Sequence, residues 1–424
     1  MKLYDIDLMK SIRIVFLMMI IVFFTGCNGK FHFFDEQGIS NCVQIVLNAD
    51  NTFYSEMPQL DKNNVVWMAN GGNDYEIYYW NGTFNSTCEP SNIIKLSNNT
   101  FQDIEPRISE GKVVWIGHEG NNSLIFYWNG SYDSNEIPSM PVKLSEGNYS
   151  AQESLIWKGE VVWKALNGSS NQIYYWDGTY KSDGNPADPL MISTPGLRAY
   201  SPQIDDDQLV FREFHRSNYE ICFWNKRYKK DSGSNKLKCT EDIRGFSAYY
   251  PSTSGGKVVW QRFDGQDIEI YYWDGKYKFD GTLTEPIKIT NNTFDDQSPV
   301  ISHNRVVWEG SYEDKKAIYY WDGTYNSIGA PSKPILISNI SFDNYAPRID
   351  MKGYNIVWEG LNNGHKGIYY WDHSFRTKKG ILISNKTTNS YFPQIDNDKV
   401  IWVGKNNGNS TIYYLDLKSI IQKK

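Results

Sequence analysis

The residues able to do chemistry are dispersed along this chain of 424 residues. Its six histidines stand far apart, and His118, His215 and His365 fall in polar stretches that we expect to be solvated loops. A metal site needs several such ligands to converge, and no Cys-x-x-Cys spacing adds to them. No Gly-x-Ser-x-Gly, His-Glu-x-x-His, P-loop or EF-hand pattern occurs either. We therefore predict a protein that is not an enzyme and has no metal site and no cofactor.

The chain has 49 acidic residues, so composition alone does not exclude a catalytic pair of carboxylates like that of glycosidases. Acidic side chains recur shortly before short apolar runs, at Asp103, Glu105, Asp295, Asp296 and Asp343. This recurrence indicates turn-forming and capping residues, because an active site breaks the symmetry of a repeat. Lys and Arg number only 43, which gives a net charge of −6. We therefore expect no nucleic-acid partner, since such proteins carry a clustered basic surface.

The elements that must position these residues repeat along the chain. An apolar run ending in an aromatic residue, then a polar stretch, then a second run rich in Ile, Tyr and Trp recurs every 44 to 50 residues. The eight copies begin at Val65, Val113, Val161, Leu209, Val258, Val306, Ile356 and Val400. Such a period is typical of repeat units that bury their apolar faces only against their neighbours.

Each copy contains four short apolar runs. In the sixth copy these are residues 299–301, 305–308, 317–321 and 334–338. The runs are β-branched, aromatic and nearly continuous, which indicates strands covered on both faces. Asn-Gly or Asp-Gly follows the third run in five copies and favours a tight turn. Four-stranded units of this length are typical of the blades of a β-propeller.

The eighth copy lacks a clear fourth run, and residues 43–47 provide a matching one before the first copy. A strand from the N-terminal side that completes the last blade would remove the open edge of the ring. We therefore predict an all-β fold: a single eight-bladed β-propeller of four-stranded blades over residues 41–424, closed by that N-terminal strand.

The repeat resembles the WD40-like propeller repeat of the TolB family, which is related to the propeller of prolyl-oligopeptidase-type enzymes. Pro299 opens the first strand, 306–308 form the second, and Ile318-Tyr319 open the third, as in that repeat. The Ser-Pro-Asp-Gly turn of the family is replaced here by 302–305. The resemblance implies an architecture and carries over no catalytic residue.

The first residues are typical of an export signal. A basic segment at 10–13 precedes eleven apolar residues at 14–24, too few to span a bilayer. The segment 24–27, Phe-Thr-Gly-Cys, resembles the processing box of bacterial lipoproteins. That resemblance implies a signal peptide at 1–26, lipid attachment at Cys27 and a tether at 27–40. The protein would then lie in the cell envelope, extracytoplasmic and lipid-anchored to a membrane; translation from Met1 or from Met9 both remain open.

Export would place the other four cysteines in a different redox environment; they are Cys42, Cys88, Cys222 and Cys239. An even set in a potentially oxidising compartment is consistent with two disulfides or with four buried thiols, and the pairing stays open.

Binding residues concentrate on variable loops held by a rigid scaffold. The loops between the second and third strands differ between copies and share one face with the connections between blades. The candidate binding residues on these loops are Asp74, His118, Glu119, Arg212, His215, Arg216, Asp264, Glu313 and Asp314. The fourth copy departs most from the repeat, because it adds two cations there.

We predict a monomeric, lipid-anchored extracytoplasmic propeller that binds an envelope protein or a peptide on this loop face. The alternative is a carbohydrate-binding propeller, and a glycan-active enzyme is less favoured. The 15 tryptophans could stack on sugars, but their positions within central strands favour packing between blades.

Overall fold

The computed structural model describes residues 45–47, 54–70, 72–87, 89–146, 150–206, 208–226, 237–240, 245–374 and 379–418. The predictions for the signal peptide, Cys27, the tether, Cys42 and Cys88 lie outside these residues. In this part of the chain no helix is long and apolar enough to cross a membrane. The described elements are all strands, so the all-β prediction is confirmed.

The strands fall into repeat units that we number along the chain. Unit 1 contains β2 (Tyr54–Asp61), β3 (Asn64–Asn70), β4 (Tyr75–Trp80) and β5 (Ile93–Lys95); unit 2 contains β6 (Asp103–Ser109), β7 (Lys112–Glu119), β8 (Asn122–Trp128) and β9 (Val142–Lys143). Unit 3 contains β10 (Ala151–Trp157), β11 (Glu160–Asn167), β12 (Ser170–Trp176) and β13 (Leu190–Met191); unit 4 contains β14 (Ala199–Ile204), β15 (Gln208–His215), β16 (Asn218–Asn225) and β17 (Leu237–Cys239).

Unit 5 contains β18 (Ala248–Ser254), β19 (Lys257–Phe263), β20 (Ile268–Trp273) and β21 (Ile287–Lys288); unit 6 contains β22 (Asp296–Ser302), β23 (Arg305–Tyr312), β24 (Lys315–Trp321) and β25 (Ile335–Leu336). Unit 7 contains β26 (Asp343–Ile349), β27 (Asn355–Asn362), β28 (His365–Asp372) and β29 (Ile381–Leu382); unit 8 contains β30 (Asn389–Asp396), β31 (Lys399–Asn406), β32 (Asn409–Asp416) and β1 (Ile45–Leu47).

Units 2 to 7 are separate four-stranded sheets, whereas units 1 and 8 share one eight-stranded sheet. The described residues therefore form seven separate sheets, whereas the sequence predicted eight blades. The sharing rests on one parallel pair, Tyr54 with Ser410. On the same free edge of β32, β1 pairs antiparallel further along the strand, with Ile45 opposite Tyr414. The early strand thus lies where the sequence placed the missing fourth strand.

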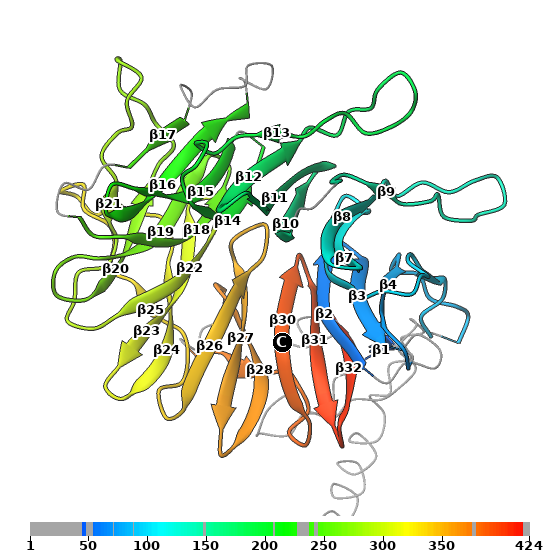
Figure 1. Ribbon diagram of the computed structural model, residues 1–424. Helices are drawn as coiled ribbons and strands as arrows, with labels where there is room; N and C mark the ends of the chain where they lie inside the picture. The colour runs from blue at the N-terminus through cyan, green and yellow to red at the C-terminus, as the bar shows by residue number, and fades with distance from the viewer. Residues whose placement is uncertain are drawn as a thin grey trace, which may run out of the picture.

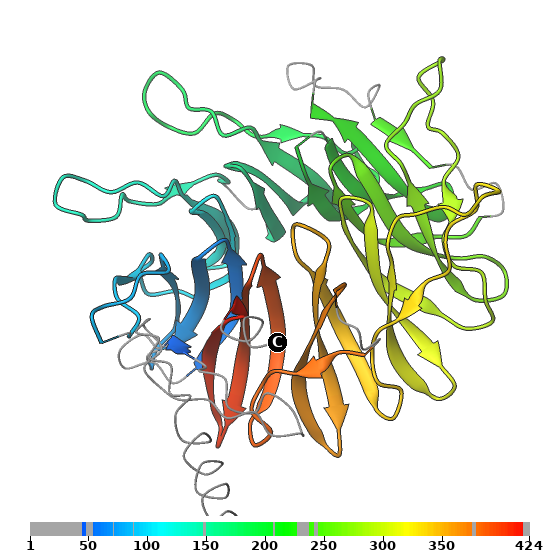
Figure 2. The ribbon, with the colours of Figure 1, turned by 180° about the vertical axis from the view of Figure 1, so that it is seen from behind.

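The units follow one another around a common centre in chain order, from unit 1 in blue to unit 8 in red, which lies beside it (Figure 1). The loops 129–141 and 177–189 project outward from units 2 and 3, as the view from behind also shows (Figure 2). The first strand of each unit lies innermost and its neighbour in the next unit packs beside it, β2 against β30 included.

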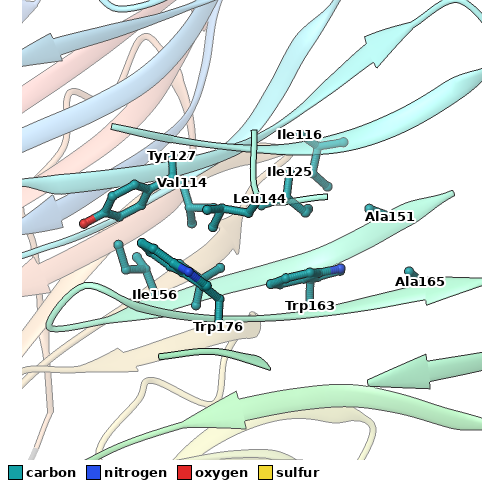
Figure 3. Close-up of a cluster of buried hydrophobic side chains, with 11 residues drawn as sticks. Val114, Ile116, Ile125, Tyr127, Leu144, Ala151, Ile156, Trp163, Ala165 and Trp176 are labelled. Atoms are coloured by element: carbon teal, nitrogen blue, oxygen red, sulfur yellow. The ribbon is translucent and has the colours of Figure 1, made fainter. Parts of the chain in front are cut away.

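Large aromatic side chains fill the space between adjacent sheets. In the cluster between units 2 and 3, Trp163 and Trp176 of unit 3 meet Val114, Ile125 and Tyr127 of unit 2 (Figure 3). Thirteen tryptophans of the described residues have no more than about 2% of their surface exposed. The packing interpretation of these residues is confirmed, and the faces that a sugar would need are covered.

Hydrogen bonds tie the inner end of one unit to the next. Asp61 of unit 1 accepts from the backbone N–H of Gly111, at 3.4 Å. Asp205 of unit 4 accepts from the N–H of Gly256, at 2.9 Å. Asp396 of unit 8 accepts from the N–H of Lys62, 334 residues away, at 2.6 Å. The same kind of contact therefore joins consecutive units and the two ends of the series.

We expect Leu47→Ala to lower the free energy of unfolding by about 2–5 kcal/mol, the usual cost of emptying a buried leucine site. Leu47 is fully buried against unit 8, whereas Val46 is 40% exposed. Val46→Ala is the matched control and should change stability by less than about 1 kcal/mol. Urea unfolding measures both; equal effects of the two substitutions would contradict the placement of β1.

Candidate functional site

The first strands of all eight units line one central cavity. Its larger lobe, about 670 Å³, lies beside the prolines near the beginning of these strands, and its smaller lobe, about 330 Å³, lies toward their ends. The residues at one equivalent position of all eight strands line the larger lobe: Gln59, Arg107, Leu155, Gln203, Ser252, Val300, Arg348 and Gln394. The strands begin beside the hairpins between second and third strands, as Tyr54 opposite Asn70 illustrates. The larger lobe is therefore on the predicted loop face.

The wall of this lobe is built from strained backbone. In each first strand the register shifts at one non-glycine residue in the left-handed region, with φ between 49° and 54°. These residues are Met57, Glu105, Glu153, Ser201, Tyr250, Ser298, Ala346 and Phe392. Each such residue costs about 1–3 kcal/mol and persists only where its surroundings hold it.

Side chains of the preceding unit hold this backbone. Glu309 of β23 accepts from the N–H of Ala346, at 2.8 Å, and Gln261 of β19 accepts from that of Ser298, at 2.7 Å. Burial raises the pKa of Glu309. Because the strained residues reach the cavity wall, neighbouring units jointly fix the shape of the cavity.

Two arginines lie in this wall. Arg107 of β6 lines both lobes, and Arg348 of β26 lines the larger one. Each donates an Nη1 hydrogen bond to the carbonyl of its own preceding proline, Pro106 at 2.9 Å and Pro347 at 3.0 Å. Burial lowers the pKa of both guanidinium groups. The sequence analysis missed both, although their position directly after the proline is visible in the repeat.

Units 4 and 5 contain a cluster of tyrosines around one arginine, next in sequence to a tyrosine that lines the larger lobe. The Arg212 guanidinium lies 4.8–5.2 Å from the ring centres of Tyr200, Tyr219 and Tyr249. The ring of Tyr250, which lines the lobe, is 60% exposed. Contacts between a cation and an aromatic face stabilise by about 0.5–2 kcal/mol each, so Arg212 is held in place while Tyr250 remains available for contact.

Unit 4 carries a pair formed by a histidine and a buried glutamate. Glu213 is fully buried, accepts from the N–H of Thr194 at 2.7 Å, and lies 2.9 Å from Nε2 of His215. Its hydrogen bond raises the pKa of His215. Beside this histidine, Cys222 and Cys239 form a disulfide. His215 is thus a half-buried strand residue, which corrects the prediction of a solvated loop.

Two of the recurrent acidic residues have a different role from the predicted turns and caps. Asp103 and Asp296 are buried and accept from the indole N–H of Trp115 and Trp308, both at 2.8 Å. Burial raises the pKa of each to about 7. In unit 7 the same place is taken by Asn344. These carboxylates serve the fold.

The predicted binding residues lie at or beside the hairpins of their units, as expected, but the hairpins are spread around the ring. Arg212, His215 and Arg216 share the hairpin of unit 4, His118 and Glu119 that of unit 2, and Glu313 and Asp314 that of unit 6. Asp74 and Asp264 lie in units 1 and 5. Glu119 pairs with Lys143 at 2.5 Å, and His118 contacts Ser123 at 2.9 Å. Asp74, Glu313 and Asp314 lie in turns. Their part in binding stays a prediction.

Two clusters in the described residues have ligand types that suit a metal ion. In the first, Asp264, Asp267 and Glu269 approach one another within 4.8 Å. Lys288 lies 2.5 Å from Asp264 and 3.3 Å from Glu269, and its hydrogen bond lowers the pKa of Asp264 to about 2. The second contains His215 with the two disulfide sulfurs. Lys288 supplies positive charge to the first, and the disulfide removes the thiolates from the second.

No family model matches the chain, and no curated protein does. Solved structures do resemble it. The β-propeller domain of the trilobed protease of Pyrococcus furiosus has a TM-score of 0.52 and 13% identity, covering 79% of this chain and 99% of that domain. A prolyl endopeptidase structure has a TM-score of 0.52 and 10% identity; the match covers 84% of this chain and 53% of the endopeptidase. An acylaminoacyl peptidase of Pyrococcus horikoshii reaches 0.49 with 14% identity, covering 84% and 58%.

The propeller fold is thereby supported, and the TolB likeness receives no support from these matches. The prediction that the chain is not an enzyme needs correction. The propellers that it resembles belong to proteases and peptidases. The prediction relied on the absence of hydrolase motifs from the sequence. Such motifs mark a catalytic domain, and a propeller domain of a protease need not contain them.

We expect Asp296→Asn to stabilise the protein at pH 8 and to leave its stability unchanged near pH 4. The pKa of Asp296 in the folded protein, about 7, exceeds the ordinary value of 3.8. The stability that protonated Asp296 contributes is therefore full below pH 3.8 and is lost as the pH rises toward 7. The amide mimics the natural Asn344. Urea unfolding between pH 4 and 8 measures the difference between variant and parent; a pH-independent difference would contradict the burial of a titrating Asp296.

We expect the His215 resonances in NMR titrations to change at a pH above the ordinary 6.5. The stability that protonated His215 contributes by pairing with Glu213 is full below pH 6.5 and is lost as the pH rises through the raised pKa. Glu213→Gln should lower the titration midpoint, because it removes the main hydrogen bond. Arg216→Gln should raise it, because it removes a repelling charge. Shifts of the same sign in both variants would be inconsistent with this pair.

Proposed function

We propose that this chain is an eight-bladed propeller, closed by β1, that binds peptide segments of a protein partner at the larger lobe of the central cavity. The pairing of β1 with β32 and the bond from Lys62 to Asp396 support closure, because they join the two ends of the series. The wall contributed by all eight first strands supports the blade count.

The observation that carries the binding proposal is the larger lobe itself. About 670 Å³ lies within the range of ligand sites, and its wall combines an exposed tyrosine, amide groups and two guanidinium groups. Such a mixture suits a peptide, since aromatic residues supply contact area while the polar groups fix the backbone. Buried tryptophan faces do not favour the carbohydrate alternative.

We place this activity in a protease-related setting. Two of the matched structures, both with a TM-score of 0.52, are propellers of a trilobed protease and of a prolyl endopeptidase. At 10–13% identity this likeness concerns the fold. A propeller that receives peptide segments is nevertheless consistent with both names.

We also retain the proposal of an exported, lipid-anchored protein with Cys27 as the attachment residue. The disulfide between Cys222 and Cys239 supports export, because such bonds persist mainly in oxidising compartments. Replacing Cys27 with Ser should release the protein from membranes into the soluble fraction, as fractionation and immunoblotting would measure. Unchanged membrane retention would exclude lipidation there.

A random dodecapeptide library displayed on phage and selected on the full chain in mild detergent tests the binding proposal. Fluorescence anisotropy then measures the affinity of the enriched peptides. Tyr250→Ala should weaken them by tenfold or more, the typical loss at an aromatic hot spot. Tyr325→Ala, a tyrosine 47% exposed outside the lobe, is the matched control and should change nothing. No enrichment, or equal losses in both variants, would refute the proposal.

A further inference from the structure

We propose that Arg107 and Arg348 form an anion subsite in the central cavity that receives the carboxylate of a peptide. The inference rests on the proposed peptide binding and specifies its ligand class. Both residues directly follow the proline of a first strand, β6 in unit 2 and β26 in unit 7, and both line the larger lobe.

The residues at this place in the eight strands show an asymmetry of charge. Gln, Leu, Ser and Val occupy the other six places, so this ring of the wall contains two cations and no anion. Neither arginine makes an ion pair in the part of the chain that the structure describes. Each guanidinium donates one hydrogen bond, to the carbonyl of the preceding proline, so most of its donors have no protein acceptor among the described residues.

The carboxylates of the same lobe do not neutralise them. Glu153 is engaged by Lys164, at 2.7 Å, and by the N–H of Ser201, at 2.8 Å. Glu309 accepts from the N–H of Ala346, and Glu359 and Glu309 attract Arg348 electrostatically without forming an ion pair with it. Glu105 attracts Arg107 electrostatically without forming an ion pair with it. The two guanidinium groups therefore retain capacity for an external anion.

The electrostatics of the pair point the same way. The first cause that lowers the pKa of Arg107 is burial, and the charge of Arg348 lowers it further. Two like charges that influence each other across one cavity are a cost to the empty protein. An anion between them would relieve that cost and replace lost hydration.

The chemistry of the donors selects a carboxylate. A guanidinium presents a planar fork of N–H groups that matches the two oxygens of a carboxylate. Gln59, Gln203 and Gln394 on the same ring can bind peptide amides through side chains that both donate and accept. At the other lobe, Asp61, Asp205, Asp350 and Asp396 line the wall. A peptide lying along the cavity would thus find opposite charges at its two ends, which favours one direction.

The test compares N-acetyl-trialanine, with its free carboxylate, and the corresponding C-terminal amide, using calorimetric titration into the full chain in mild detergent. The free acid should bind at least tenfold more tightly than the amide. Arg107→Gln combined with Arg348→Gln should remove this preference. Arg198→Gln, an exposed arginine outside the cavity wall, is the matched control and should preserve it.

Acid and amide binding equally, or a preference that survives in the double variant, would overturn the inference. Circular dichroism and thermal melting check the variants, and the ligand-free double variant should melt no lower than the parent because a repulsion has been removed. A large drop in its melting temperature would assign the arginines to the fold instead. Phage-selected peptides that depend on Tyr250 but ignore both arginines would refute this subsite and leave the proposed function standing.

Discussion

The structure depends on hydrogen bonds that link the inner end of each unit to its neighbour. A four-stranded sheet of this composition cannot bury both faces alone, so every unit needs a partner on each side. The carboxylates of Asp61 and Asp205 bind the backbone of the following unit, and Asp396 does the same for Lys62. Because these bonds lie at the centre, they also set the width of the cavity.

Local patterns predicted the strands well. The regular tryptophans and the Asp-Gly turns indicated four-stranded units, and the resemblance of 43–47 to a fourth strand anticipated the pairing of β1 with β32. The left-handed residues before proline could not be predicted, since a residue in this place normally adopts an extended conformation. Their conformation is held by side chains such as Glu309, which belong to the preceding unit. The partnership of Asp296 with the Trp308 indole likewise requires the fold.

The sequence analysis did not identify the cavity wall, for a related reason. Variation between the hairpin loops drew attention to the loops themselves, where residues such as Glu119 form ion pairs of their own. The difference between units with the clearest consequences is one of charge, and it lies in the first strands. At the equivalent position of the cavity wall six units have uncharged residues, and the other two have Arg107 and Arg348. Their chemistry is evident in the sequence, but their convergence on one cavity follows only from the arrangement of the units.

Photo-crosslinking tests most directly whether the central cavity receives a peptide. A selected peptide carrying benzoylphenylalanine would be irradiated with the full chain, and the crosslinked residues would be mapped by mass spectrometry. The account predicts crosslinks to the first strands, around Tyr250 and its neighbours in the wall. Crosslinks confined to the outward loops, such as 129–141, would contradict it.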